Sequence, residues 1–317
     1  MKYRAFDRAV ESDEPLPELP SAHGSGEPRF RVSWHAPIRW PSGLRWHRLW
    51  SGDGTDGGVA IARRGGTSFL RFDGVATAAI DRGRIALAPD PWVDPEAVRH
   101  ALLDQILPLA LAAEGETVLH ASAVEADGAA LLLLGGAGSG KSTLAAALSA
   151  RGACVLADDG VLLERRGEDV WAVPSYRGLR LWPDAASSAG ACGFSRPPRR
   201  DTTPIATKYR LVPADRDAGA LSRPLAAAYS LGPGASIAFA RLSRRDAALE
   251  FVRHTFMPDV QGRTAVVARL DRAASWSGRL QIWRLDAPRD FAFLPQLARA
   301  VLAHAGACAA SVRLQGQ

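Results

Sequence analysis

The sequence has few cysteines and few lysines. Its three cysteines show neither paired nor Cys-x-x-Cys spacing, so neither a disulfide framework nor a thiolate metal site is indicated. Of the 39 basic residues only Lys2, Lys141 and Lys208 are lysines, and the other 36 are arginines. A lysine inside a motif is therefore an informative residue in this chain.

Long apolar runs and clustered charge are also missing. No run approaches the ~20 apolar residues of a membrane span, and the N-terminus carries charge where a signal peptide needs an apolar core. The net charge is +6, but the arginines are spread along the chain, which argues against nucleic-acid binding. We expect a cytoplasmic protein that binds neither nucleic acid nor membrane; both a monomer and a homo-oligomer fit the sequence.

The first ninety residues contain short apolar segments separated by Gly, Pro and Asp. Those at 30–34, 58–62, 68–72 and 84–87 are typical of strands joined by turns. The tryptophans of this section fit core or inter-domain packing, and stacking on a base or sugar is the alternative. We predict a β-rich N-terminal domain over residues 1–92.

The rest of the chain has α/β patterning. An apolar face at helical spacing follows Asp94-Pro95 and ends at Gly115. Strands are then expected at 118–124, 129–134 and 153–157, with a helix at 141–151, and a Pro/Gly/Ser/Arg-rich loop at 185–204. We predict an α/β catalytic domain over residues 93–317.

A glycine-rich loop lies between the strand ending at 134 and the helix starting at 141. It reads Gly135, Gly136, Ala137, Gly138, Ser139, Gly140, Lys141, Ser142 and Thr143, which fits the phosphate-binding P-loop pattern. In such loops backbone N–H groups surround the phosphates, the lysine reaches the outer phosphates, and the serine hydroxyl ligates Mg²⁺. The loop therefore predicts an ATP and Mg²⁺ site, whereas a plain strand-to-helix turn is the structural alternative.

Two carboxylates, Asp158 and Asp159, follow Lys141 after one helix and one strand. Adjacent residues at a strand end point in different directions, so one can hold the metal while the other accepts a hydroxyl proton during phosphoryl transfer. An Asp-Asp-Gly turn is the structural alternative. A GTPase motif is not indicated, because Arg210 stands where that motif needs an aspartate, and no ABC-type signature is present.

The order His120, P-loop, Asp158-Asp159 resembles the HPr kinase/phosphorylase family. By itself His120 reads as a hydrogen-bonded core histidine. The resemblance implies a P-loop kinase core of the HPr kinase type, Asp158 as proton acceptor, His120 supporting it, and Asp159 with Ser142 binding Mg²⁺. It further implies a protein or peptide serine kinase.

Arg177 and Arg180 resemble the arginine segment that follows the Asp pair in that family. The glutamate two residues before the arginine is Ser175 here, which speaks against a metal contact at this position and against phosphorolysis. We expect one of the two arginines to contact the transferred phosphoryl group; ordinary solvent exposure is the alternative.

A closer resemblance is to the HPr-kinase-like enzymes of lasso-peptide clusters. It rests on the start of the chain, on Leu119-His120-Ala121-Ser122 and on Leu179 to Asp184. It implies a peptide substrate, a lasso precursor phosphorylated at its C-terminal serine. Arg196, Arg199 and Arg200 of the 185–204 loop are candidates for pairing with the terminal carboxylate of such a peptide, and a disordered surface insertion is the alternative. An HPr-like carrier as substrate, a non-catalytic nucleotide-dependent peptide-binding module and a mechanical ATPase are the alternatives.

Overall fold

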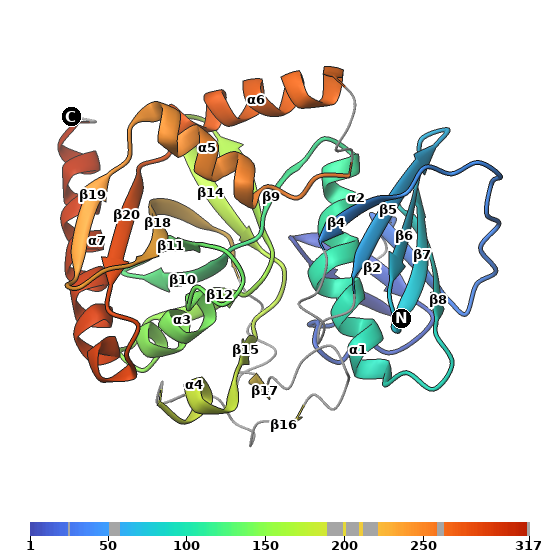
Figure 1. Ribbon diagram of the computed structural model, residues 1–317, viewed down its shortest axis with the longest axis horizontal. Coiled ribbons are helices and arrows are strands. Elements are labelled where there is room, and N and C mark those ends of the chain that lie inside the picture. The colour runs from blue at the N-terminus through green and yellow to red at the C-terminus, as the bar shows by residue number, and fades with distance from the viewer. Residues whose placement is uncertain are drawn as a thin grey trace.

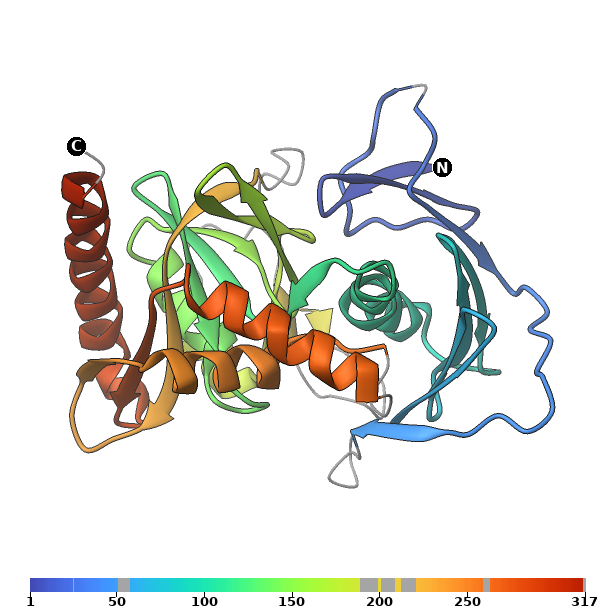
Figure 2. The same ribbon diagram turned by 90° about the horizontal axis from the view of Figure 1, so that it is seen from above.

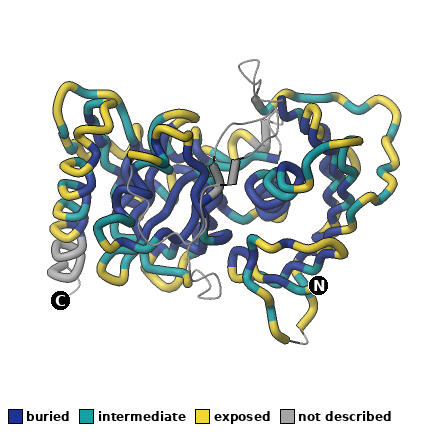
Figure 3. The backbone as a smooth tube through the Cα atoms, turned by 90° about the horizontal axis from the view of Figure 1, so that it is seen from below, coloured by how far each residue is buried: buried dark blue, intermediate teal, exposed yellow. Residues whose placement is uncertain are grey.

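The computed structural model describes residues 1–24, 26–50, 58–188, 199–200, 209–211, 221–258 and 263–315. Two lobes, each built on a mixed β-sheet, lie side by side and are joined by one long helical segment (Figure 1). The buried residues concentrate in the two sheets and in that helical segment (Figure 3). In the part of the chain described, no helix has the length and apolar character needed to cross a membrane.

The N-terminal sheet has eight strands in the order β1-β2-β3-β8-β7-β6-β5-β4. Antiparallel pairs dominate, and β3 pairs in parallel with both β2 and β8. The predicted β-rich character is confirmed, although the sequence signals did not include the first hairpin, β4 or β7. The strands are β1 (Lys2–Ala5), β2 (Arg8–Ser12), β3 (Phe30–Trp34), β4 (His47–Trp50), β5 (Val59–Arg64), β6 (Thr67–Phe72), β7 (Ala76–Asp81) and β8 (Arg84–Pro89).

The linking helical segment consists of α1 (Pro95–Ala101), a π-helical turn at Leu102–Ile106, and α2 (Leu107–Ala113). The side chain of Asp94 caps it by accepting from the amide of Glu96 at 2.8 Å. Seen along its axis, the segment lies in the hollow of the curved N-terminal sheet (Figure 2). Its apolar residues share one buried cluster with that sheet, so the predicted helix is confirmed and forms part of the first lobe's core.

The second sheet has nine strands, and β11, the strand before the glycine-rich loop, lies in its interior. Its order is β12-β10-β11-β18-β14-β13-β9, with β20 pairing β18 and β19. The run of leucines in β11 is buried on both faces, as expected for a central strand covered by helices. The strands are β9 (Thr117–Leu119), β10 (Ser122–Ala126), β11 (Ala129–Leu134), β12 (Cys154–Ala157), β13 (Val161–Arg166), β14 (Asp169–Pro174), β18 (Arg223–Pro233), β19 (Ala238–Arg241) and β20 (Ile282–Ala287).

Helices cover both faces of this sheet, which gives the second lobe three layers. One face packs against α3 (Lys141–Ser149) and α7 (Leu294–Gln315), and the other packs against α5 (Arg244–His254) and α6 (Arg263–Ser277). A short 3₁₀ turn at Phe291–Phe293 precedes α7. The α/β class predicted for this part of the chain is confirmed as a mixed sheet with helices on both faces.

Two expectations need correction. The strand predicted at 118–124 is two strands, β9 and β10, because the chain leaves the sheet at His120 and Ala121. The loop expected from residue 185 begins as the end of helix α4 (Pro183–Ser188), and Arg199–Arg200 form strand β16. Strand β16 and β15 (Leu179–Leu181) both pair with β17 (Tyr209–Leu211); the remainder of that loop, including Arg196, lies outside the described residues.

Candidate active site

The glycine loop connects β11 to α3, as the sequence predicts. Gly138 and Gly140 have φ angles of +72° and +95°, and Gly140 caps the N-terminus of α3. A Cβ atom at Gly135 would clash with the Ser139 side chain, so a larger residue here would require this side chain to move. The first turn of α3 therefore points its free N–H groups into the loop, which is the arrangement that binds phosphate groups.

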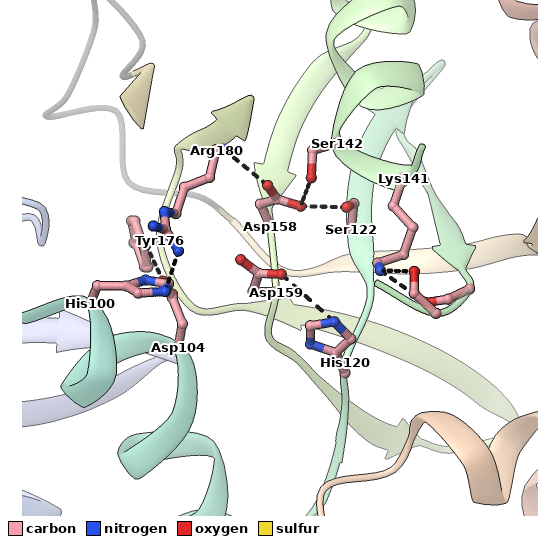
Figure 4. Close-up of polar contacts among 12 residues, drawn as sticks. His100, Asp104, His120, Ser122, Lys141, Ser142, Asp158, Asp159, Tyr176 and Arg180 are labelled. Carbon is pink, nitrogen blue, oxygen red and sulfur yellow. Dashed lines mark hydrogen bonds and ion pairs between the residues drawn. The ribbon is translucent and has the colours of Figure 1, made fainter. Parts of the chain in front are cut away.

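Lys141 lies at the first position of α3 and is buried. Its ammonium group donates to the carbonyl oxygens of Gly135 at 2.9 Å and Gly136 at 3.2 Å (Figure 4). These contacts hold the cation inside the loop and leave Ser142 and Thr143 on the next positions of the helix. The predicted phosphate-binding residues 135–143 thus form one continuous loop and helix start.

Asp158 occupies the end of β12 and is buried against α3. Its Oδ1 accepts from the Ser142 hydroxyl at 3.1 Å and from the Ser122 hydroxyl. Its Oδ2 accepts from the backbone N–H of Arg180 at 3.2 Å (Figure 4). Strand β10 lies between β11, which leads into the glycine-rich loop, and β12, which leads into Asp158. Ser122, at the start of β10, therefore lies next to Asp158.

Burial and the neighbouring Asp159 carboxylate together raise the pKa of Asp158 to about 6. Burial is the larger cause, and the three hydrogen bonds to Ser122, Arg180 and Ser142 oppose it. A carboxylate with a pKa near 6 is ionised at neutral pH and binds a proton more strongly than an ordinary aspartate. The environment therefore suits a group that accepts a proton.

Asp159 has a left-handed backbone conformation, φ +69°, and points away from Asp158 toward His120. The distance from His120 Nε2 to Asp159 Oδ1 is 3.8 Å, and both side chains are partly exposed. Burial lowers the pKa of His120, with Asp159 opposing and Lys141 adding to the shift. The backbone N–H of His120 donates to His254 at 2.6 Å, which fixes the connection between β9 and β10.

The oxygen atoms near Asp158 are of the kind that magnesium prefers. Ser142 and Asp158 lie within hydrogen-bond distance, Asp159 is the next residue, and a hydroxyl and carboxylates are hard donors. Among the described residues no group of three or more His, Cys, Asp or Glu side chains could hold a metal by itself. Few protein oxygens are what a Mg²⁺ site completed by phosphates and water needs.

Arg177 and Arg180 differ in their surroundings. Arg177 packs against β12, where its guanidinium donates to the Val155 carbonyl at 3.2 Å and contacts Cys154 Sγ at 3.1 Å. Arg180 is buried in the middle of β15, and its backbone N–H donates to Asp158. This hydrogen bond thus connects β15 directly to Asp158.

Four polar residues near the site carry no assigned role in the sequence analysis. Ser122 belongs to the Leu-His-Ala-Ser motif, which is the one signal that could have indicated it. The others are Tyr176 and two residues of the linking helix, His100 and Asp104. His100 and Asp104 are one helical turn apart inside an apolar pattern, and nothing in the sequence pairs them with Arg180.

No protein-family model matches the chain, and no curated protein matches it. Among solved structures, the Hpr(Ser) kinase/phosphatase from Coxiella burnetii matches with 14% identity and a TM-score of 0.30. The match covers 58% of this chain and 94% of that one.

Proposed function

We propose that this protein is a Mg·ATP-dependent kinase that phosphorylates a serine hydroxyl of a peptide. One observation carries the proposal: Ser142, in the first turn behind the phosphate-binding loop, shares a 3.1 Å hydrogen bond with the buried Asp158. This hydrogen bond places the glycine-rich loop, which suits phosphate binding, next to the Asp158 carboxylate, which suits proton acceptance. Phosphoryl transfer to an alcohol needs both.

The residues divide the reaction as follows. The loop amides and Lys141 bind the β- and γ-phosphates, where a fixed cation in a water-poor site stabilises the developing charge. The acceptor oxygen forms a bond to the γ-phosphorus, the bond to the bridging oxygen breaks, and ADP leaves. Asp158 takes the hydroxyl proton, since its pKa of about 6 keeps it ionised at neutral pH.

Four residues complete the proposed site. Ser142 and Asp159 would hold Mg²⁺, which when bound would neutralise charge on the phosphate oxygens. His120 stands beside Asp159, and its lowered pKa keeps the imidazole neutral, so that it can hydrogen-bond to the acceptor without repelling Lys141. Arg180, whose backbone N–H donates to Asp158 and whose guanidinium contacts His100, supplies a second fixed cation.

For the acceptor we propose a serine at the C-terminus of a short precursor peptide of the lasso type. The support is the sequence resemblance through Leu119-His120-Ala121-Ser122 and Leu179–Asp184. A buried carboxylate at the end of a strand requires the hydroxyl to reach into the protein, and a flexible peptide end does this more easily than a folded domain.

The test is phosphate transfer from γ-labelled ATP to three acceptors: a peptide ending in serine, the same peptide with the serine internal, and a folded HPr-like carrier. We expect label on the first, located at the terminal serine by mass spectrometry. Label on the carrier alone would replace the peptide substrate with a protein substrate. Binding of Mg·ATP without transfer would indicate a nucleotide-dependent binding module, and phosphate release alone an ATPase.

Lys141→Ala should abolish transfer and weaken nucleotide binding. The matched control is Lys2→Ala, because Lys2 also donates to two backbone carbonyls, those of Gly24 and Gly26, but lies in the N-terminal lobe. Equal activity of the two variants would remove Lys141 from the proposed mechanism.

A further inference from the structure

A polar cluster joins the linking helix to the proposed phosphoryl-transfer site. It consists of His100 and Asp104 on the helix, Tyr176 after β14, and Arg180 on β15 (Figure 4). Asp104 lies in the π-helical turn and is only 1% exposed. A π-turn inside an otherwise α-helical segment often marks a functional position, because it displaces one residue from the regular helical face.

The hydrogen bonds of the cluster have a defined direction. The Tyr176 hydroxyl donates to Asp104 Oδ2 at 3.1 Å, and His100 Nδ1 contacts the same oxygen. Since a carboxylate only accepts, His100 must carry its proton on Nδ1, which leaves a lone pair on Nε2. That lone pair faces Arg180 Nη1, which always carries hydrogen and donates. Asp104 therefore fixes the imidazole tautomer that His100 needs to hold the guanidinium.

Arg180 is held at both of its ends. Its backbone N–H donates to Asp158 Oδ2 at 3.2 Å, and its guanidinium contacts His100 from the other lobe. The residue is 8% exposed, so the charge is fixed in a water-poor space against His100. A guanidinium fixed before the reaction stabilises developing phosphoryl charge without a cost of reorganisation.

We propose that Asp104 and His100 are positioning residues that hold Arg180 for phosphoryl transfer. The inference rests on the proposed kinase function and adds to it a requirement for the linking helix. Because that helix packs in the core of the N-terminal sheet, the first lobe supplies part of the support for the site in the second lobe.

The experiment compares Asp104→Asn, His100→Phe and the mild variant Tyr176→Phe with the unaltered chain. The first readout is the affinity for Mg·ADP, and the second is the affinity for Mg·ADP with aluminium fluoride, which mimics the transferring phosphoryl group. We expect Mg·ADP affinity within about two-fold, and aluminium fluoride complex affinity lower by about 10- to 100-fold in the first two variants, the scale of a misplaced catalytic group. Tyr176→Phe, which loses one hydroxyl, should lose only a few-fold and retain its fold.

A double-variant comparison separates positioning from simple structural support. In an Arg180→Lys background, Asp104→Asn should cause no further loss, because the group it positions has already been replaced. The matched control is Arg99→Gln. Arg99 lies on the same helical segment and forms a 2.9 Å ion pair with Glu18, so its replacement should lower the melting temperature and leave both affinities unchanged.

The outcomes are distinct. The inference would be overturned if the affinity losses of Asp104→Asn and Arg180→Lys add fully in the double variant. It would also be overturned if Asp104→Asn, like Arg99→Gln, lowered only the melting temperature. Either result would leave the kinase proposal intact. Failure of the unaltered chain to bind either nucleotide complex would overturn the proposed function, and the positioning role with it.

Discussion

The ring of Phe6 lies against Gly160, the residue that directly follows the two aspartates. A Cβ atom at Gly160 would be 3.3 Å from the tip of that ring and 3.5 Å from Pro108. Phe6 is in the two-residue turn between β1 and β2, has a φ of +53° and donates its backbone N–H to Pro174 at 3.0 Å. The first hairpin of the chain is thus packed onto the turn that carries the catalytic candidates.

This contact predicts that Phe6→Leu lowers both stability and activity. The substitution removes part of a buried ring, with an expected loss of about 1 to 2 kcal/mol in the free energy of unfolding. It also frees the turn at Asp159 and Gly160, so kcat should fall while the protein remains folded. Phe30→Leu is the control, since Phe30 is equally buried in the same lobe but lies in β3. Equal kcat in the two variants, measured at equal folded fraction, would disprove the coupling.

Local patterns in the sequence predicted the elements that position the phosphate loop. The leucine run of β11, the glycines and Lys141 each act within a few residues, so their arrangement follows from local geometry. The helix at 95–113 was also predictable, because Asp94 and Pro95 mark its start and an apolar face continues to its end.

The contacts between distant segments were not predictable in the same way. Asp104 and Tyr176 are 72 residues apart, and Phe6 meets Gly160 across the two lobes. Each residue alone reads as ordinary core or helix surface, and only the packing of the linking helix brings them together. The break at His120 was missed for a related reason: the apolar residues on both sides continue the strand pattern, and the interruption depends on a backbone bond to His254 in α5.

The raised pKa of Asp158 predicts a stability that depends on pH. The unfolded chain releases this proton near pH 4 and the folded chain near pH 6, so the folded state holds the extra proton between these values and becomes less stable as pH rises through them. Asp158→Asn removes the effect. Without nucleotide and in chelator, the variant should gain about 1 kcal/mol relative to the unaltered chain between pH 5 and pH 7.5.

Urea unfolding at the two pH values measures this difference. Glu168→Gln is the control, since the Glu168 side chain is 94% exposed and its replacement should leave the pH dependence unchanged. A difference between Asp158→Asn and the unaltered chain that stays constant with pH would show that Asp158 titrates as an ordinary carboxyl.

The two adjacent aspartates should give different kinetic defects. Asp158→Asn keeps the shape of the side chain but accepts no proton, so kcat should fall by about 10²-fold or more with nucleotide affinity changed only a few-fold. Asp159→Asn should raise the magnesium concentration at half-saturation, because a cation held by few protein oxygens loses one of them. Magnesium titrations of both variants measure the two effects. If Asp158→Asn instead raised the magnesium requirement and Asp159→Asn lowered kcat, Asp158 would be the metal ligand and Asp159 the proton acceptor. The hydrogen bond between Ser142 and Asp158 would be consistent with that assignment.

The two arginines allow a comparison within one short segment, because they are three residues apart and the backbone N–H of Arg180 donates to Asp158. In Arg180→Lys an ammonium replaces the guanidinium that contacts His100 through Nη1, and the ammonium lacks the planar fork that matches phosphate oxygens. We expect kcat to fall more than KM rises, since the lost interaction belongs to the transition state. Arg177→Lys should instead lower the melting temperature with little change in kcat, because Arg177 holds β12 through the Val155 carbonyl and Cys154. Steady-state kinetics and thermal unfolding of the pair decide the point: a kcat loss in Arg177→Lys as large as that in Arg180→Lys would mean that the β12 contact itself sets the position of Asp158.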